Sequence, residues 1–163
     1  MEKVDFKKAF VELIQQNERI IYKICSVYTT TELPIPDLHQ EVVCNLWAGF
    51  AKFRHECSVS TWIYRVAINT CITETRKDIR HPKSSGLVAD LADLLPAPES
   101  MTDDIREMYR LINQLRTIEK TVVLLYLEEK SYQEIADITG LTLSNVATKL
   151  KRSREKLKQL LNL

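Results

Sequence analysis

Glycine is scarce in this chain of 163 residues, which contains three glycines and no cluster of them. A glycine-rich phosphate-binding loop is therefore not expected. Long hydrophobic runs are also missing. None approaches the roughly 18–20 residues of a membrane span, and the first six residues lack the apolar core of a signal peptide. We therefore expect a cytoplasmic protein that does not insert into a membrane.

Paired cysteines and a catalytic grouping are missing as well. The four cysteines, Cys25, Cys44, Cys57 and Cys71, are irregularly spaced without a C-x-x-C pair, so neither a disulfide framework nor a zinc ribbon is expected. Cys57 and His55 supply half of a metal site, but no second ligand pair accompanies them. The histidines lie in different segments, and no Ser/His/Asp grouping is apparent. We predict reduced thiols, no metal, no cofactor and no enzymatic activity.

Helical periodicity is what the sequence does contain. Hydrophobic residues make up 45% of the chain and recur every three or four positions, which predicts an all-α fold. This spacing predicts one helix over about 6–28, a second over 37–53 and a third after residue 58, around a common core. Because prolines precede it, the second helix is expected to start near Asp37, which caps it with Gln40 as its capping-box partner. We expect Trp47 in the core and a structural role for Trp62.

The composition changes between residues 82 and 103, which hold four acidic residues, one lysine and several prolines and serines. This stretch is predicted to be a linker, and the spacing of its leucines leaves a short helix open. Helical spacing resumes at Asp104. The sequence therefore predicts two small helical domains, residues 1–81 and 104–163, joined by a flexible acidic linker over 82–103.

The segment from Ser131 onward predicts a helix-turn-helix. Ser131 and Glu134 form an S-x-x-E capping box, and Gly140 lies where the first helix has to end in a left-handed conformation. Ala136 is small enough to let two helices cross closely, and Thr142 is placed to cap the second helix. The apolar spacing of that second helix buries one face, formed by Val146, Leu150, Ser153, Leu157 and Leu160.

The opposite face of this last helix is polar and basic. The net charge of the chain is +1, but the last 23 residues hold six basic residues and one acidic residue. A major groove about 12 Å wide admits one α-helix, whose N-terminal polar groups contact base edges while Lys and Arg contact phosphates. The face that we expect to meet DNA consists of Ser144, Asn145, Thr148, Lys149, Lys151 and Arg152.

Two separate sets of motifs resemble regions of bacterial sigma factors of the extracytoplasmic-function (ECF) group. The segment 115–157, which includes SYQEIADITGLTLSNVATKLKRSREKL, resembles their region 4. In the N-terminal part, DLHQEVVCNLW over 37–47 resembles region 2.2, and FRHECSVSTWIYRVAINT over 53–70 resembles regions 2.3 to 2.4. The order of these motifs and the length of the chain are also similar to this group.

This resemblance implies a sigma factor that directs core RNA polymerase to specific promoters. The N-terminal domain would recognise and melt the minus-ten element, and the helix-turn-helix would recognise the minus-thirty-five element, with Arg154 joining Lys151 and Arg152 on phosphates. Its implied partners are the β′ and β subunits of core RNA polymerase, promoter DNA and an anti-sigma factor.

The resemblance also implies site residues in the N-terminal domain. Contacts with polymerase are implied for Asp37, Gln40, Glu41 and Asn45, close to Trp47. A pocket for a non-template base and its phosphates is implied for the loop from Arg54 to Ser60 together with Arg65, Asn69 and Thr73. A base taken out of the stack needs an aromatic platform, for which Trp62 and Tyr64 are candidates.

Two other functions stay open from the sequence. A helix-turn-helix repressor or activator has the same kind of C-terminal domain and binds duplex DNA without polymerase. A helical adaptor binds only protein, and its basic face is merely solvated. Loss of binding as salt rises distinguishes either DNA-binding protein from the adaptor. The motifs of the N-terminal domain favour a sigma factor over a repressor.

Overall fold

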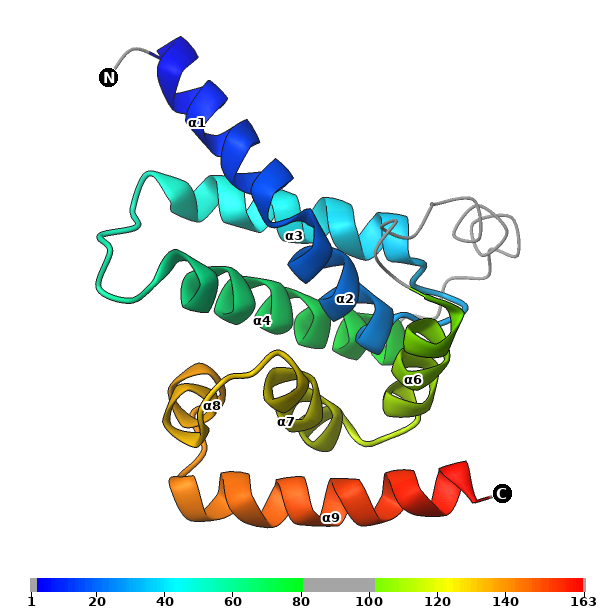
Figure 1. Ribbon diagram of the computed structural model, residues 1–163. Helices are drawn as coiled ribbons and strands as arrows, with labels where there is room; N and C mark the ends of the chain where they lie inside the picture. Colours follow the sequence, from blue (N-terminus) through cyan, green and yellow to red (C-terminus); the bar gives the residue numbers. More distant parts are fainter. Residues whose placement is uncertain (1–2, 81–101, 163) are drawn as a thin grey trace.

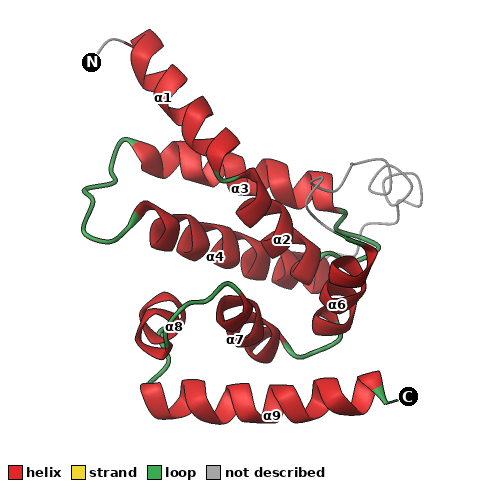
Figure 2. Cartoon of the chain, in the orientation of Figure 1, coloured by secondary structure: helices red, strands yellow, loops and turns green. Residues whose placement is uncertain are grey.

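A computed structural model describes residues 3–80 and 102–162 of the chain. All regular elements in these two ranges are helices, which confirms the predicted all-α fold (Figure 2). They are α1 (Lys3–Gln16), α2 (Glu18–Tyr28), α3 (Ile35–Phe50), α4 (Val59–Arg80), α6 (Asp103–Asn113), α7 (Thr117–Leu127), α8 (Tyr132–Thr139) and α9 (Leu143–Leu161). The linker helix that the sequence left open lies outside the described residues.

The N-terminal half is built on α2, α3 and α4, which pack against one another (Figure 1). Their core is apolar and includes Ile24, Leu38, Leu46, Ile63 and Ala67, all fully buried. The three-helix core agrees with the periodicity of the sequence, because the buried positions recur every three or four residues along each helix.

The single helix predicted over 6–28 is wrong, because the chain changes direction at Asn17. This residue leaves the helical region (φ −116°, ψ 16°), and its side-chain amide donates a hydrogen bond to the carbonyl oxygen of Leu13 at 2.8 Å. An Asn side chain that bonds to the backbone competes with helix propagation. As a result α1 departs from α2 and projects from the molecule (Figure 1).

The start of α3 also differs from the prediction. The helix begins at Ile35 after Pro34, no side chain caps it, and Asp37 lies inside its first turn. Pro36 is accepted there because the first N–H groups of a helix have no partner within the helix. The capping box predicted for Asp37 and Gln40 is therefore wrong, although the carboxylate of Asp37 still interacts favourably with the helix dipole.

Trp47 is not a core residue, contrary to the prediction. Its side chain is 43% exposed and packs on one side against α1, with ring centroids 5.5 Å from Phe6 and 5.0 Å from Phe10. By contrast, Trp62 is half-buried and stacks on Phe53. Its expected structural role agrees with these contacts.

The C-terminal half is organised around α7. Seven consecutive residues of this helix, from Glu119 to Leu125, are buried, because α7 packs against α9, α8, α6 and also α2. The helices α7 and α8 lie between α4 and α9 (Figure 1). Before them, α6 begins at Asp103 and is capped by the hydroxyl of Thr102, so the last residue assigned to the linker is helical.

The turn at Gly140 provides a test of the fold. Gly140 has φ +79°, and a Cβ built on it meets nothing within 4 Å, so Gly140→Ala introduces backbone strain without a clash. We expect this change to lower the free energy of unfolding by about 1 kcal/mol, which lowers the Tm by roughly 2–4 °C for a chain of this size.

Gly49 provides the matched control. It lies in α3, where an added Cβ makes an ordinary contact of 3.5 Å with Trp62. Gly49→Ala is expected to leave the Tm unchanged or raise it slightly, because alanine favours a helix. Thermal unfolding followed by circular dichroism makes the comparison. Equal Tm values for the two variants would contradict the left-handed turn.

Candidate nucleic-acid interface

The helix-turn-helix forms as the sequence predicted. The hydroxyl of Ser131 accepts a hydrogen bond from the Glu134 backbone N–H, and the Glu134 carboxylate accepts one from the Ser131 backbone N–H. The helix α8 ends at Gly140 in the left-handed conformation, and the hydroxyl of Thr142 caps α9. The predicted capping box, turn and second cap are all confirmed. These local contacts fix where α9 begins.

One face of α9 packs against α7 and α8. Val146, Leu150 and Ser153 are buried, and Leu157 and Leu160 are partly buried. The ammonium of Lys156 binds both carboxylate oxygens of buried Glu119 in α7 at 2.9 Å. This ion pair and the apolar contacts fix the rotation of α9 about its axis, and therefore which side chains face outward.

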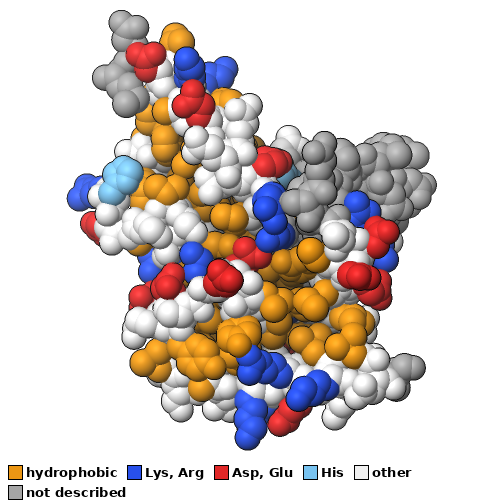
Figure 3. Space-filling model, in the orientation of Figure 1, with side chains coloured by type: hydrophobic (Ala, Val, Ile, Leu, Met, Phe, Trp, Pro, Cys, Tyr) orange, Lys and Arg blue, Asp and Glu red, His pale blue; other side chains and the backbone are white. Residues whose placement is uncertain are grey.

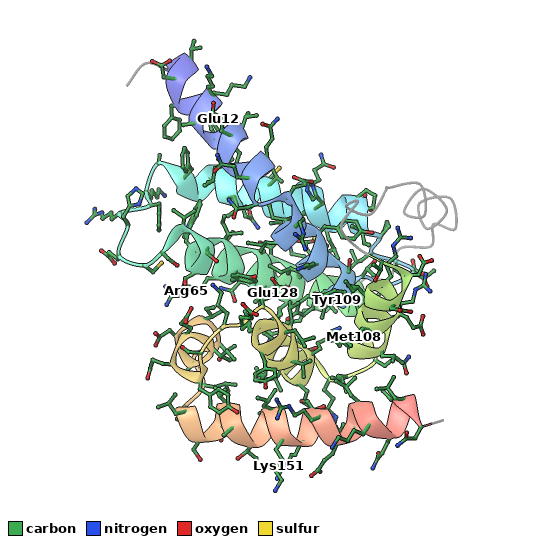
Figure 4. All side chains as sticks on the ribbon, viewed as in Figure 1. Glu12, Arg65, Met108, Tyr109, Glu128 and Lys151 are labelled. Carbon is green, nitrogen blue, oxygen red and sulfur yellow. The ribbon has the colours of Figure 1, made fainter. Side chains whose placement is uncertain are left out.

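The outward face of α9 carries the residues that the sequence assigned to DNA. Figure 3 shows Lys and Arg side chains gathered at the lower edge of the molecule, and Lys151 in Figure 4 points away from the other helices. Lys149 is half-buried, and the remaining members of the predicted set are exposed: Ser144, Asn145, Thr148, Lys151, Arg152 and Arg154. The structure therefore brings all seven together on one helix.

A shallow basic groove extends this face toward α8. It is lined by Tyr132 of α8 and by residues of α9 that include the cations Lys151, Arg154 and Lys158 and one carboxylate, Glu155. The guanidinium of Arg154 lies 4.4 Å from the centre of the Tyr126 ring, a cation–π contact that fixes its position. Cations that follow a helix in this way are suited to the phosphates on one side of a major groove.

In the N-terminal half, a polar groove of about 370 Å³ lies between α3 and α4. Asn69 and Thr73 of α4 line it together with Glu41 and Asn45 of α3. The side-chain amide of Asn45 donates to the hydroxyl of Thr70 at 2.9 Å, whereas Asn69 is exposed. Residues predicted for DNA and for polymerase thus share one groove, a juxtaposition that sequence spacing does not show.

The loop between α3 and α4 carries an aromatic stack. The Phe53 ring stacks on Trp62 at 4.8 Å, and exposed His55 lies 4.6 Å from Phe53. His55 has a left-handed backbone (φ 58°), which costs roughly 1 kcal/mol for a residue with a side chain. Arg54 beside it is exposed. His55 lies in the loop that the sequence assigned to the base pocket, whereas Phe53, just before that loop, was not among the predicted residues.

Two residues predicted for the base pocket instead face the C-terminal half. Tyr64 is buried, and its hydroxyl donates to Glu128 at 3.0 Å, so it provides no exposed stacking platform; that prediction is wrong in this arrangement. Arg65 donates to the carbonyl oxygen of Asp137 in α8 at 3.1 Å. Arg65 is therefore engaged with α8 and does not line the groove that contains Asn69 and Thr73, although it lies only one turn before Asn69 on α4.

The predicted polymerase residues lie on α3. Asp37, Gln40, Glu41 and Asn45 are spaced by three, one and four positions and are all exposed. This spacing places them on one side of the helix. The structure thus brings the four residues onto one surface, whereas their contact with polymerase stays a prediction.

The described residues show no metal centre and no membrane helix. Within 3–80 and 102–162, no three His, Cys, Asp or Glu side chains are grouped to hold a metal ion. Across the same ranges, no helix combines the length and apolar character of a membrane span.

A hydrogen bond with Cys71, together with burial, raises the pKa of the Cys25 thiol, which keeps it protonated and unreactive.

Comparisons with known proteins agree with both halves of this arrangement. The model of sigma-70 region 2 matches residues 13–81, and the model of sigma-70, region 4 matches residues 105–157. RNA polymerase sigma factor YlaC of Bacillus subtilis is 33% identical over 129 residues, which are 76% of this chain and 75% of that protein. The ECF RNA polymerase sigma-E factor of Haemophilus influenzae is 27% identical over 162 residues, covering 91% and 85%.

A solved structure shares the fold. The sigma factor RpoE from Bartonella quintana, in complex with the anti-sigma factor NepR, superposes with a TM-score of 0.71 at 18% identity and covers 98% of each chain. The two family models and the curated relatives, together with this all-helical fold and its helix-turn-helix, define a transcription protein of the sigma type.

The chain belongs to the sigma-70 family, in its ECF group. The resemblance found in the sequence is therefore confirmed. Members of this group direct core RNA polymerase to promoters, so a repressor that acts on duplex DNA alone is not favoured.

The basic face of α9 generates a test by salt dependence. Each phosphate that a lysine neutralises contributes about −0.9 to the slope of log K against log salt. Lys151→Gln should therefore reduce the slope for a random-sequence duplex by about 1. Lys7→Gln, an equal change of charge at an exposed position of α1, should leave it unchanged. Equal slopes for both variants would show that Lys151 does not neutralise a phosphate.

Proposed function

We propose that the two halves divide promoter recognition between them. Residues 104–163 form the domain that binds the minus-thirty-five element, and residues 1–81 form the domain that binds the minus-ten element and core polymerase. The stretch 82–103 connects them, except that its last residue, Asp103, already belongs to α6. The observation that supports this division most directly is the exposed, capped N-terminus of α9 on one domain and the polar groove between α3 and α4 on the other.

In the C-terminal domain, α9 enters the major groove with its first turns. Ser144, Asn145 and Thr148 are exposed there and have side chains that hydrogen-bond to base edges. An Asn amide pairs with adenine through two hydrogen bonds, which contributes about 1–3 kcal/mol of discrimination. Lys149, Lys151, Arg152 and Arg154 bind the flanking phosphates.

In the N-terminal domain, the groove between α3 and α4 holds a base displaced from the duplex. Asn69 offers a donor and an acceptor to its Watson–Crick edge, and Thr73 lies one turn further along α4. The aromatic stack of His55, Phe53 and Trp62 borders the loop and offers a surface for stacking, which contributes about 1–3 kcal/mol per base. Arg54 in the loop and Arg65 on α4 neutralise phosphates of the single strand.

The exposed polar side of α3 binds the β′ subunit of core polymerase through Asp37, Gln40, Glu41 and Asn45. Because Glu41 and Asn45 also line the groove that holds Asn69, bound polymerase adjoins the displaced base. A polymerase that lies against this wall excludes water from the groove, which strengthens the hydrogen bonds that recognise the base.

Further proposals concern the setting of the protein. It acts in the cytoplasm without catalytic activity of its own, as a binding partner of the β′ and β subunits and of promoter DNA. An anti-sigma factor controls its availability. The sigma factor RpoE of Bartonella quintana was solved in complex with the anti-sigma factor NepR, and CnrH in complex with the cytosolic domain of CnrY, which supports this proposal.

Transcription by core polymerase on a pool of genomic promoter fragments tests the assignment of both asparagines. With Asn145→Ala, we expect a weaker preference at one position of the minus-thirty-five motif, by roughly 1–3 kcal/mol, because a base-edge contact is lost. With Asn69→Ala, the preference should weaken in the minus-ten motif. Sequencing of transcript start sites measures both.

The matched control is Asn162→Ala, since Asn162 is exposed beyond the end of α9 and distant from its first turns. It should leave both motifs unchanged. If each asparagine variant lowered transcription uniformly over all promoters, neither side chain would recognise a base, and the proposed division would be wrong.

A further inference from the structure

Glu128 joins four helices across the boundary between the two halves. It lies at the end of α7, and its side chain is 13% exposed. One carboxylate oxygen accepts hydrogen bonds from Lys23 of α2 at 3.0 Å and Tyr109 of α6 at 3.2 Å, and the other accepts one from Tyr64 of α4 at 3.0 Å. Figure 4 shows Glu128 and Tyr109 between α4 and the helices below it. We call these four residues the Glu128 cluster.

Both carboxylate oxygens of Glu128 are hydrogen-bonded within the cluster. Burial raises the pKa of the Tyr64 and Tyr109 phenols, and the neighbouring Glu128 carboxylate raises it further, so both remain protonated and donate. Lys23 provides the opposite charge. Two of the three donors, Lys23 and Tyr64, come from the N-terminal half, so separation of the halves removes the cation and one phenol from a carboxylate that is otherwise largely buried.

Other polar contacts follow the same boundary. Lys130 donates to the hydroxyl of Ser60 at 3.0 Å and lies 5.0 Å from the centre of the Tyr64 ring. Asn113 of α6 donates to the carbonyl oxygen of Thr29 at 2.7 Å. Arg65 donates to the carbonyl oxygen of Asp137. All of these groups form good hydrogen bonds with water as well, which is typical of an interface that opens.

The closed arrangement is too small to bind both promoter elements. The minus-ten and minus-thirty-five elements lie ten and thirty-five base pairs before the transcription start. They are therefore about 85 Å apart along a duplex that rises 3.4 Å per base pair. In the closed protein, α8 packs against both α4 and α9, so the axes of α4 and α9 are separated by roughly two helix-packing distances, or about 20 Å. The two halves therefore have to separate to bind both elements. The 21 residues between Arg80 and Thr102 limit how far they can separate, because a fully extended chain of this length spans at most about 70–75 Å.

We propose that the Glu128 cluster holds the free protein in a closed, autoinhibited arrangement, and that the two domains have to separate at this boundary before the protein engages core polymerase and both promoter elements. Separation also releases Arg65 from Asp137 for the single strand. The proposal depends on the promoter functions proposed above. Core polymerase shifts the population because it binds the separated arrangement better than the closed one.

Charge reversal within the cluster tests this proposal. Glu128→Lys places a cation against Lys23 and removes the acceptor for both tyrosines. The double variant Lys23→Glu with Glu128→Lys restores an ion pair with its charges exchanged. Glu129→Lys makes the same change of charge at the next residue, which is exposed, and serves as the matched control. Helix content by circular dichroism confirms that each variant is folded.

Two readouts are measured on the full chain: the radius of gyration by small-angle scattering, and the association rate with core polymerase in the absence of DNA. The wild type and Glu129→Lys should have a radius of gyration of about 15 Å, as for a compact chain of this length. Glu128→Lys should raise the radius by roughly a third and the association rate up to about tenfold, since the competent fraction then approaches one. The double variant should return both values toward those of the wild type.

Three outcomes would overturn the proposal. A folded Glu128→Lys variant with the radius of the wild type would show that the cluster does not hold the domains together. An expanded variant with an unchanged association rate would show that closure does not inhibit. If no variant bound core polymerase while the radius still responded, the promoter function itself would be wrong, and with it the inhibition inferred from it.

Discussion

The structure depends on the burial of α7 from all sides. A helix of eleven residues with seven consecutive buried positions is not stable alone in water. The helices α9, α8 and α6 cover it within its own half, and α2 adds a contact from the other half. Its two buried charges both have partners: Glu119 forms an ion pair with Lys156, whereas Lys120 donates to the side-chain oxygen of Asn113 and lies 4.8 Å from the centre of the Tyr28 ring. Burial lowers the pKa of Lys120, which shows that this side chain has lost much of its hydration. The helix that supports the DNA-binding domain is therefore also the helix that contacts the other domain.

This double use of α7 explains how a DNA-binding face and a closed domain boundary coexist. The contacts of α7 with α9 consist of apolar side chains and the buried ion pair between Glu119 and Lys156. Both helices belong to the same half, so the helix-turn-helix keeps its geometry when the domains separate. Its hydrogen bonds to the N-terminal half are made by Thr121 in the middle of the helix, to Tyr28 of α2, and by Glu128 at its end, to Lys23 of α2 and Tyr64 of α4. Water satisfies such groups after separation, which lowers the free-energy cost of opening the boundary. A binding partner can therefore change the arrangement without unfolding either domain.

Local patterns in the sequence predicted the elements that local interactions determine. The capping box at Ser131, the left-handed turn at Gly140 and the buried face of α9 follow from residues within one or two turns of each other, and all are present. The errors arose where distant residues or competing local bonds decide. Asn17 ends a helix that periodicity alone continues, and Trp47 is exposed because α1 covers only one side of it. The Glu128 cluster had no signal in the sequence, since its members are up to 105 positions apart and Glu128 resembles an ordinary solvated turn residue. Likewise, the shared groove of Asn45 and Asn69 becomes apparent only when α3 and α4 are packed together.

Transcription from a duplex promoter with purified core polymerase tests the central claim that the chain is a sigma factor with two promoter-binding domains. The account predicts transcripts with defined start sites when the full chain is added to core polymerase. It predicts none when residues 1–80 or 102–163 are added alone, because each then engages only one element. Specific binding of the full chain to duplex DNA, with no association with core polymerase and no transcript, would contradict it.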